Sequence, residues 1–196
     1  MIEVEKKFIL SDEDRATLLN GAMPVGVKKF TDVYFDTADY ALTKMDWWLR
    51  ERDGRFELKV PADKVNRDVE TNQYHEFETE AEIKEKLSIE TDRPLKEVLD
   101  GFGYVPFATI ATTREKFKKE GFTIDVDEMD FGFHVAEVEV MVNEKDDVEL
   151  AKRLIFEFAE RHKLAVKPTR GKVLEYLARY SEDHFHALET AWGIKI

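Results

Sequence analysis

The sequence predicts an α+β fold in which a largely antiparallel sheet closes into a barrel, with a charged interior and with helices packed on the outside. Three observations lead to this prediction. Apolar and polar residues alternate with the period of a strand through most of the chain, and the connections are too short for parallel crossovers. Helical patterns gather toward the C-terminus. Whole strands also carry charges of a single sign, whereas a solvent-exposed sheet face normally mixes positive and negative side chains.

The expected elements follow one another along the chain. Strands are expected at residues 2–8, 31–35, 47–52, 55–60, 73–79, 112–118, 122–127 and 133–142. Helices are expected at residues 11–21, 80–89, 95–102, 148–162, 172–180 and 182–191. Ser11 with Asp14 forms a capping pattern at the first helix, and Asp53-Gly54 is a strong hairpin turn. No linker or repeat interrupts this order, so we expect one domain spanning residues 1–196.

The composition excludes several classes of protein. The chain contains 30 Lys and Arg residues and 42 Asp and Glu residues, which gives a formal net charge of −12. Such an acidic surface repels nucleic acids. The absence of cysteine excludes disulfides, zinc–thiolate sites and cysteine nucleophiles. The chain is too aromatic for a disordered protein and too charged for a membrane protein, and its start lacks a signal-peptide pattern. We expect a cytoplasmic monomer that binds a small molecule, with no nucleic-acid or membrane partner.

The sorting of charge among the strands points to a ligand. Acidic strands carry Glu3 and Glu5, Glu76 and Glu78, Asp125 and Asp127, and Glu137 and Glu139, whereas basic strands carry Arg50 and Arg52, Lys59, and Arg114, Lys116 and Lys118. Residues two apart lie on the same face of a strand, and the opposite faces are apolar, so the charged faces are expected to line the barrel. Carboxylates are ligands for magnesium, and guanidinium groups match phosphate. The interior therefore suits a polyphosphate bound together with a divalent cation.

Several different short motifs also follow one another in a fixed order along nearly the whole chain. They are Glu3-Val4-Glu5-Lys6-Lys7, Tyr34-Phe35-Asp36-Thr37, Trp48-Leu49-Arg50-Glu51-Arg52, Glu57-Leu58-Lys59, Arg114, Asp125-Val126-Asp127, Glu137-Val138-Glu139 and Lys172. The set resembles the CYTH family, the triphosphate tunnel metalloenzymes, whose signature is ExExK, and within it the soluble thiamine triphosphatases. The resemblance implies an eight-stranded antiparallel tunnel. It also implies a hydrolase, dependent on magnesium with manganese as an alternative, that converts thiamine triphosphate to the diphosphate and phosphate.

The resemblance implies roles for individual side chains. The metal ligands would be Glu3, Glu5, Asp125, Glu137 and Glu139; Glu76 and Asp127 are further candidates, or else salt-bridge partners of a neighbouring cation. The triphosphate would be held by Lys7, Arg50, Arg52, Arg114 and Lys172. Lys116 and Lys118 are expected at a solvated strand end. Lys59 would activate the attacking water, because cationic neighbours disfavour its charged form. Tyr34 would pair with Lys59 or serve as a core aromatic residue.

Trp48 shares the strand face of Arg50 and Arg52 by parity. It would contact the cationic thiazolium ring of thiamine, with Asp46 nearby, or else plug the mouth of the barrel. Three other functions are compatible with the sequence: an inorganic tripolyphosphatase, an adenylyl cyclase of the same fold, and a polyphosphate-binding module without catalysis.

Overall fold

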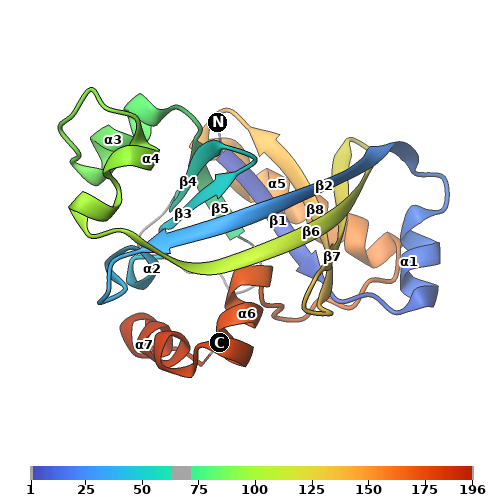
Figure 1. Cartoon of the computed structure of the whole chain (residues 1–196). Helices are drawn as coiled ribbons and strands as arrows, with labels where there is room; N and C mark the ends of the chain where they lie inside the picture. Colours follow the sequence, from blue (N-terminus) through green and yellow to red (C-terminus); the bar gives the residue numbers. More distant parts are fainter. Residues whose placement is uncertain (1, 63–71, 196) are drawn as a thin grey trace. The chain divides into compact units, whose positions relative to one another are not determined.

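The computed structural model describes residues 2–62 and 72–195, and its central element is a closed antiparallel barrel (Figure 1). The strand order is β1-β5-β4-β3-β2-β6-β7-β8, and pairing of β8 with β1 closes the sheet. The strands are β1 (Ile2–Phe8), β2 (Met23–Asp36), β3 (Trp48–Arg52), β4 (Arg55–Pro61), β5 (Asn72–Phe77), β6 (Val105–Lys119), β7 (Phe122–Met129) and β8 (His134–Val142). The predicted fold class, an eight-stranded barrel with helices outside, is confirmed.

The helices agree with the sequence pattern except for one short element. They are α1 (Asp12–Leu19), α2 (Ala41–Lys44), α3 (Glu80–Leu87), α4 (Leu95–Val98), α5 (Val148–Arg161), α6 (Lys172–Tyr180) and α7 (Glu182–Trp192), with 3-10 turns η1 (Asp100–Phe102) and η2 (Lys145–Asp147). Ser11 and Asp14 form the predicted capping box at α1. Only α2 was not predicted. Across the described ranges, every helix is too short or too polar to cross a bilayer.

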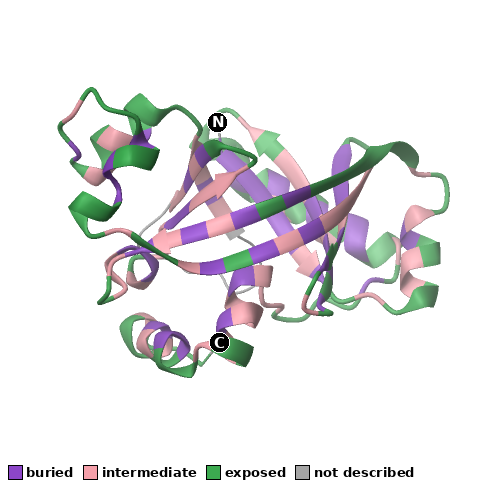
Figure 2. Cartoon of the chain, in the orientation of Figure 1, coloured by how far each residue is buried: buried purple, intermediate pink, exposed green. Residues whose placement is uncertain are grey.

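Two strands are longer than the sequence pattern predicts. β2 begins at Met23 instead of residue 31, and β6 begins at Val105 instead of residue 112. Pro24, Gly26 and Pro106 disfavour strands in isolation, which is why these segments were not expected to be extended. β2 and β6 are neighbours in the sheet, and pairing along both strands overrides this local preference. The first half of β2 is exposed (Figure 2), so it lacks the one-sided burial that marks a strand in a sequence.

The chain divides into two compact units. The first comprises Met1–Lys29, Pro61–His75 and Thr112–Lys172, and the second comprises Phe30–Val60, Glu76–Ala111 and Val173–Ile196. Each unit has its own hydrophobic cluster and its own set of charged side chains. The expectation of a single domain over residues 1–196 stays a prediction.

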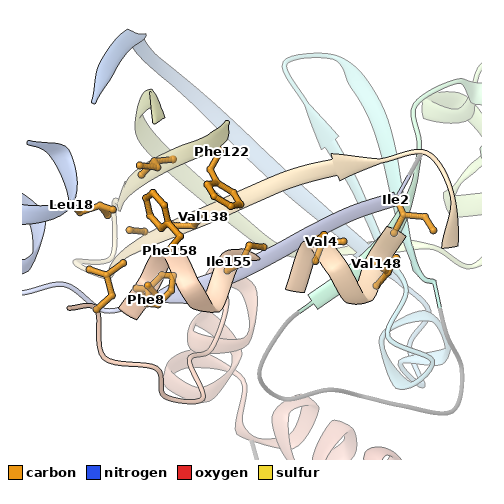
Figure 3. Packing of buried hydrophobic residues seen from close by; sticks show 14 residues of the cluster. Ile2, Val4, Phe8, Leu18, Phe122, Val138, Val148, Ile155 and Phe158 are labelled. Carbon is orange, nitrogen blue, oxygen red and sulfur yellow. The ribbon is translucent and has the colours of Figure 1, made fainter. Parts of the chain in front are cut away.

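In the first unit, one face of β1, β7 and β8 packs against α5 (Figure 3). Val4 and Phe8 of β1 lie against Ile155 and Phe158 of α5, and all four are at most 1% exposed. The rings of Phe122 and Phe158 have centroids 5.0 Å apart. Burial of each such side chain contributes about 1.5–3 kcal/mol. Because side chains alternate along a strand, Glu3, Glu5 and Lys7 of β1, Asp125 and Asp127 of β7, and Glu137 and Glu139 of β8 lie on the opposite, inner face of the barrel.

The second unit is built in the same way. Leu49 of β3 and Leu58 of β4 pack against Ile83 of α3 and Leu95 of α4. Trp47, which directly precedes β3, packs at the margin of this cluster. Arg50 and Arg52 of β3 and Glu57 and Lys59 of β4 alternate with these apolar residues and therefore face the interior, whereas Glu51 shares the outer face of Leu49.

A buried polar cluster in the second unit joins α7 to α2. Asp36, which is 1% exposed, accepts hydrogen bonds from the backbone N–H groups of Leu42 and Thr43 and from Thr43 Oγ1. Because the Thr43 hydroxyl donates to Asp36, its oxygen accepts a hydrogen bond from His184 Nε2 at 2.8 Å. Burial lowers the pKa of His184 to about 4, although the charge of Asp36 acts in the opposite direction. His184 is therefore a neutral donor at pH 7.

This cluster makes stability depend on pH. Below the ordinary His pKa of 6.5 the unfolded chain binds a proton that folded His184 takes up only near pH 4. The free energy of unfolding should therefore fall between pH 6.5 and 4, on the order of 2 kcal/mol from this group alone. Urea unfolding of wild type and His184→Gln at pH 7 and pH 4.5 should show that the variant loses part of this dependence. His134→Gln, at an exposed position of β8, is the control. Identical pH dependence in wild type and His184→Gln would contradict the prediction.

Candidate active site

The inner face of the first unit gathers carboxylates on β1 and β8. One oxygen each of Glu3, Glu5 and Glu139 lies within 4.8 Å of the other two. The strand register explains this convergence, because Glu5 stands directly opposite Glu139. Glu3 and Glu5 are 7% and 4% exposed. Three acidic groups thus converge at a spacing that a single cation can bridge.

Asp125 of β7 adds a fourth carboxylate to this region. It is fully buried, and among the residues that the structure describes its Oδ1 is a buried side-chain oxygen that no hydrogen bond reaches. Burial raises the pKa of Asp125. Burial, together with the charges of Glu3 and Asp125, raises the pKa of Glu139 to about 8. Crowded carboxylates with an unsatisfied oxygen form a set of hard oxygen donors, which fits magnesium or manganese.

Arginine and lysine side chains balance these acids. Arg114 of β6 donates from Nε and Nη2 to the two oxygens of Asp127 at 2.7 and 2.6 Å, and from Nη1 to Asp125 Oδ2 at 2.5 Å. Its Nη2 also lies 3.2 Å from Glu137 Oε2. Lys7 Nζ lies 3.6 Å from Glu137 Oε1. Asp127 therefore forms a salt bridge with Arg114, which the sequence analysis gave as the alternative to metal binding.

The expectation that Lys116 is a solvated strand end is wrong. Its Nζ lies 3.0 Å from Asp125 Oδ2 and 3.6 Å from Glu139 Oε1, so it belongs to the same charged group. Lys118 donates to Thr123 Oγ1 at 2.5 Å across the same pair of strands. Both lysines alternate with Arg114 along β6, and strand parity alone places them on its face.

The chain around residue 171 brings another cation to the first unit. Lys172 begins α6, and its Nζ lies 3.4 Å from Thr112 Oγ1 on β6. A Cβ added at Gly171 would approach Lys7 Cε to 3.1 Å, so the backbone passes close to the Lys7 side chain. Lys7 also contacts Glu5. Its ammonium group is thus held by both backbone packing and charge.

In the second unit, the arginines of β3 meet counter-ions that sequence reasoning missed. Asp32, with no exposed surface, accepts hydrogen bonds from Arg52 Nε at 2.6 Å and Nη2 at 3.0 Å, and lies 3.8 Å from Arg50 Nε. Glu57 of β4 accepts from Arg50 Nε at 2.8 Å. The Arg52 guanidinium also lies over the ring of Phe30, 4.0 Å from its centroid. Parity could have found both acids, because Asp32 alternates with Tyr34 and Glu57 alternates with Lys59.

The two residues expected to be catalytic both lie in the second unit. Lys59 Nζ forms an ion pair with Glu76 Oε1 at 2.8 Å. Glu76 thus forms a salt bridge, which the sequence analysis gave as the alternative to metal binding. Tyr34 is 4% exposed and pairs in register with Arg50. Burial, followed by the charge of Asp32, raises the pKa of Tyr34 to about 12. Tyr34 therefore keeps its proton at pH 7 and can donate a hydrogen bond.

Trp48 lies at the start of β3, in register with Lys59. Its Nε1 donates to Asp46 Oδ1 at 2.8 Å. Its ring makes an edge contact with Trp192 of α7. Trp48 is 7% exposed and carries an aromatic surface at one end of the row of cations on β3.

Comparison with known proteins gives a consistent result. The family model described as CYTH domain matches residues 1–168. The chain is 30% identical to a thiamine-triphosphatase of Homo sapiens and to one of Macaca fascicularis, in each case over 96% of this chain and 89% of the relative. The structure of the PH1819 protein from Pyrococcus horikoshii OT3 matches with a TM-score of 0.66 and 23% identity, over 90% of this chain and 98% of that one. That structure shows a shared fold.

Asp32 should be needed for stability, because it is the buried counter-ion of two arginines. Asp32→Ala is expected to lower the free energy of unfolding by about 3–5 kcal/mol, the cost of leaving a buried charge without its partner. Glu51→Ala removes the acid of the exposed ion pair with Lys96 and should cost less than about 1 kcal/mol. Urea unfolding of both variants at pH 7 measures the difference. Equal small losses would show that Asp32 does not balance the arginines.

Proposed function

The chain belongs to the CYTH family, and we propose that it is a magnesium-dependent hydrolase that removes the terminal phosphate of thiamine triphosphate, giving thiamine diphosphate and phosphate. The observation that carries the proposal is the convergence of Glu3, Glu5 and Glu139 in the first unit, together with an arginine of the same unit held by carboxylates. Enzymes of this family act on triphosphates. The similarity to two thiamine-triphosphatases over nearly the whole chain supports the choice of substrate.

The proposed metal ligands are the acids of the first unit. Glu3, Glu5 and Glu139 converge, Asp125 has an oxygen to offer, and Glu137 stands opposite Asp125 in the register of β7 and β8. Bound magnesium or manganese would neutralise charge on phosphate oxygens. Glu76 and Asp127 already pair with Lys59 and Arg114, so we assign them the positioning of those cations.

The proposed phosphate ligands are cations already oriented by acids. Arg114 and Lys7 are held by carboxylates of the first unit, where Lys172 is also placed. Arg50 and Arg52 are held by Glu57 and Asp32. Arg52 uses Nε and Nη2 for Asp32, and we assign its Nη1 to a phosphate oxygen. Such preorganised donors lower the reorganisation that the transition state requires.

Hydrolysis of a phosphoric anhydride needs an oriented water and neutralised oxygens rather than covalent chemistry. Lys59, held by Glu76, would orient and activate the attacking water. Tyr34 would act as a neutral hydrogen-bond donor, because its raised pKa keeps the phenol protonated. Trp48 and Asp46 would contact the cationic thiazolium ring, a cation–π contact worth about 0.5–2 kcal/mol.

A phosphate-release panel tests the proposed function. With magnesium, kcat/KM should be highest for thiamine triphosphate, compared with inorganic tripolyphosphate and ATP, and chromatography should detect thiamine diphosphate. EDTA should abolish the activity. Preference for tripolyphosphate would indicate an inorganic triphosphatase, and cyclic AMP from ATP would indicate a cyclase. No phosphate release with magnesium, manganese or calcium would leave a binding module.

Lys59→Ala should lower kcat for thiamine triphosphate by roughly 100-fold or more, because it removes the group that activates water. KM should change little, since the proposed phosphate ligands remain. Lys96→Ala is the matched control, because this exposed lysine also pairs with one glutamate but lies outside the proposed site. Steady-state kinetics at saturating magnesium measures both parameters. A Lys59→Ala enzyme with normal kcat would remove Lys59 from the mechanism.

A further inference from the structure

Two tryptophans meet in the second unit, and the proposed hydrolysis uses only one of them. Trp192, the last residue of α7, contacts Trp48 of β3 with ring centroids 6.3 Å apart and planes at 83°. Such an edge-to-face pair is attractive and fixes the orientation of one ring relative to the other. It also covers at most one face of Trp48. The pair therefore orients Trp48.

A single short turn holds both indole N–H groups. Trp48 Nε1 donates to Asp46 Oδ1 at 2.8 Å, and Trp192 Nε1 donates to the carbonyl oxygen of Lys44 at 3.1 Å. Asp46 has a φ of 63°, a left-handed conformation that aspartate tolerates better than most residues. The turn between α2 and β3 thus sets the positions of both rings.

The other end of α7 is attached to the same region. His184 bonds to Thr43, and its ring stacks on Tyr40 with centroids 3.9 Å apart and planes at 9°. Tyr40 has a φ of 63°, a strained conformation for a bulky residue that persists only where the surrounding contacts impose it. The helix is therefore anchored near its first and its last turn, and this anchoring determines the place of Trp192.

The tryptophan pair adjoins the proposed phosphate-binding residues. Trp48 pairs in register with Lys59 and lies two residues before Arg50 on the same face of β3. A triphosphate bound to these cations would bring its organic group to Trp48. The carboxylate of Asp46 at the indole edge favours a group with positive charge, and tryptophan is the best cation–π partner.

We propose that Trp192 is a specificity-determining residue, which together with Trp48 and Asp46 forms a subsite for a cationic aromatic group on the substrate. Trp192 fixes the orientation of the Trp48 indole, and thereby how the indole meets this group. A neutral nucleobase lacks the charge that Asp46 and the indole recognise. The inference rests on the proposed function, because it takes the neighbouring cations to be the phosphate ligands.

The test compares substrates with and without the organic group. Trp192→Leu should raise KM for thiamine triphosphate roughly 3- to 10-fold, the scale of one aromatic contact, with kcat nearly unchanged. Both parameters for tripolyphosphate should stay at wild-type values. Trp192→Phe, which keeps an aromatic edge and preserves packing, should recover most of the affinity. His186→Gln, on the exposed side of the same helix, is the matched control.

Binding measurements and a double variant complete the test. Calorimetry should show weaker binding of thiamine diphosphate to Trp192→Leu. The double variant Trp48→Ala with Trp192→Leu should have a KM for thiamine triphosphate only slightly higher than that of Trp48→Ala alone, because Trp192 acts through Trp48. Equal losses for thiamine triphosphate and tripolyphosphate would make Trp192 a residue of the fold only. A lowered KM would show that it obstructs the subsite. Either result overturns the inference.

Different experimental results would contradict the proposed function and this inference. A wild-type protein that hydrolyses tripolyphosphate but not thiamine triphosphate would contradict the proposed function. A wild-type protein that hydrolyses thiamine triphosphate, with an unchanged KM in Trp192→Leu, would contradict only the role of Trp192.

Discussion

Charge balance on the inner face is the constraint on which the rest of the structure depends. Closing the sheet removes that face from bulk water, where an unpaired charge would cost several kcal/mol. The described structure meets this cost with close ion pairs, including Arg52 with Asp32, Arg114 with Asp127, and Lys59 with Glu76. The acids of β2, β4, β5 and β7 are therefore as necessary to the barrel as its apolar outer face. This balance also fixes where each arginine points.

The balance is least complete where the carboxylates of β1 and β8 converge. Glu3, Glu5 and Glu139 crowd one another, and Asp125 keeps a buried oxygen without a hydrogen bond. A fold selected only for stability would place fewer acids here, because each added carboxylate raises the cost of ionising the others. Local conflict of this kind is characteristic of functional sites. The first unit thus concentrates its electrostatic cost where a divalent cation would relieve it.

The sequence predicted the barrel because its strands have period two, and one face is apolar while the other is charged. The same period assigned the inner-facing acids and arginines, which depend only on parity along a strand. The pairing partners could not be predicted in this way. Asp32 meets Arg52, and Lys116 meets Asp125, through strand registers that a single sequence does not display. The α2 turn was missed for a similar reason, because its N–H groups are satisfied by the buried Asp36.

The C-terminal helix is an exception to the pattern in which helices pack on the apolar outer face and charged residues lie on the inner face. Helices α3, α4 and α5 pack against apolar faces of the sheet, so sequence changes there are expected to act through stability. Helix α7 instead ends in a residue that touches Trp48, an inner-face side chain of β3. Under the proposed function, a change in α7 would therefore alter binding of the organic group while the ion pairs of the inner face stay as they are. In the proposed function, β3 carries both the arginines that bind phosphate and Trp48, whereas α7 contributes only to the orientation of Trp48.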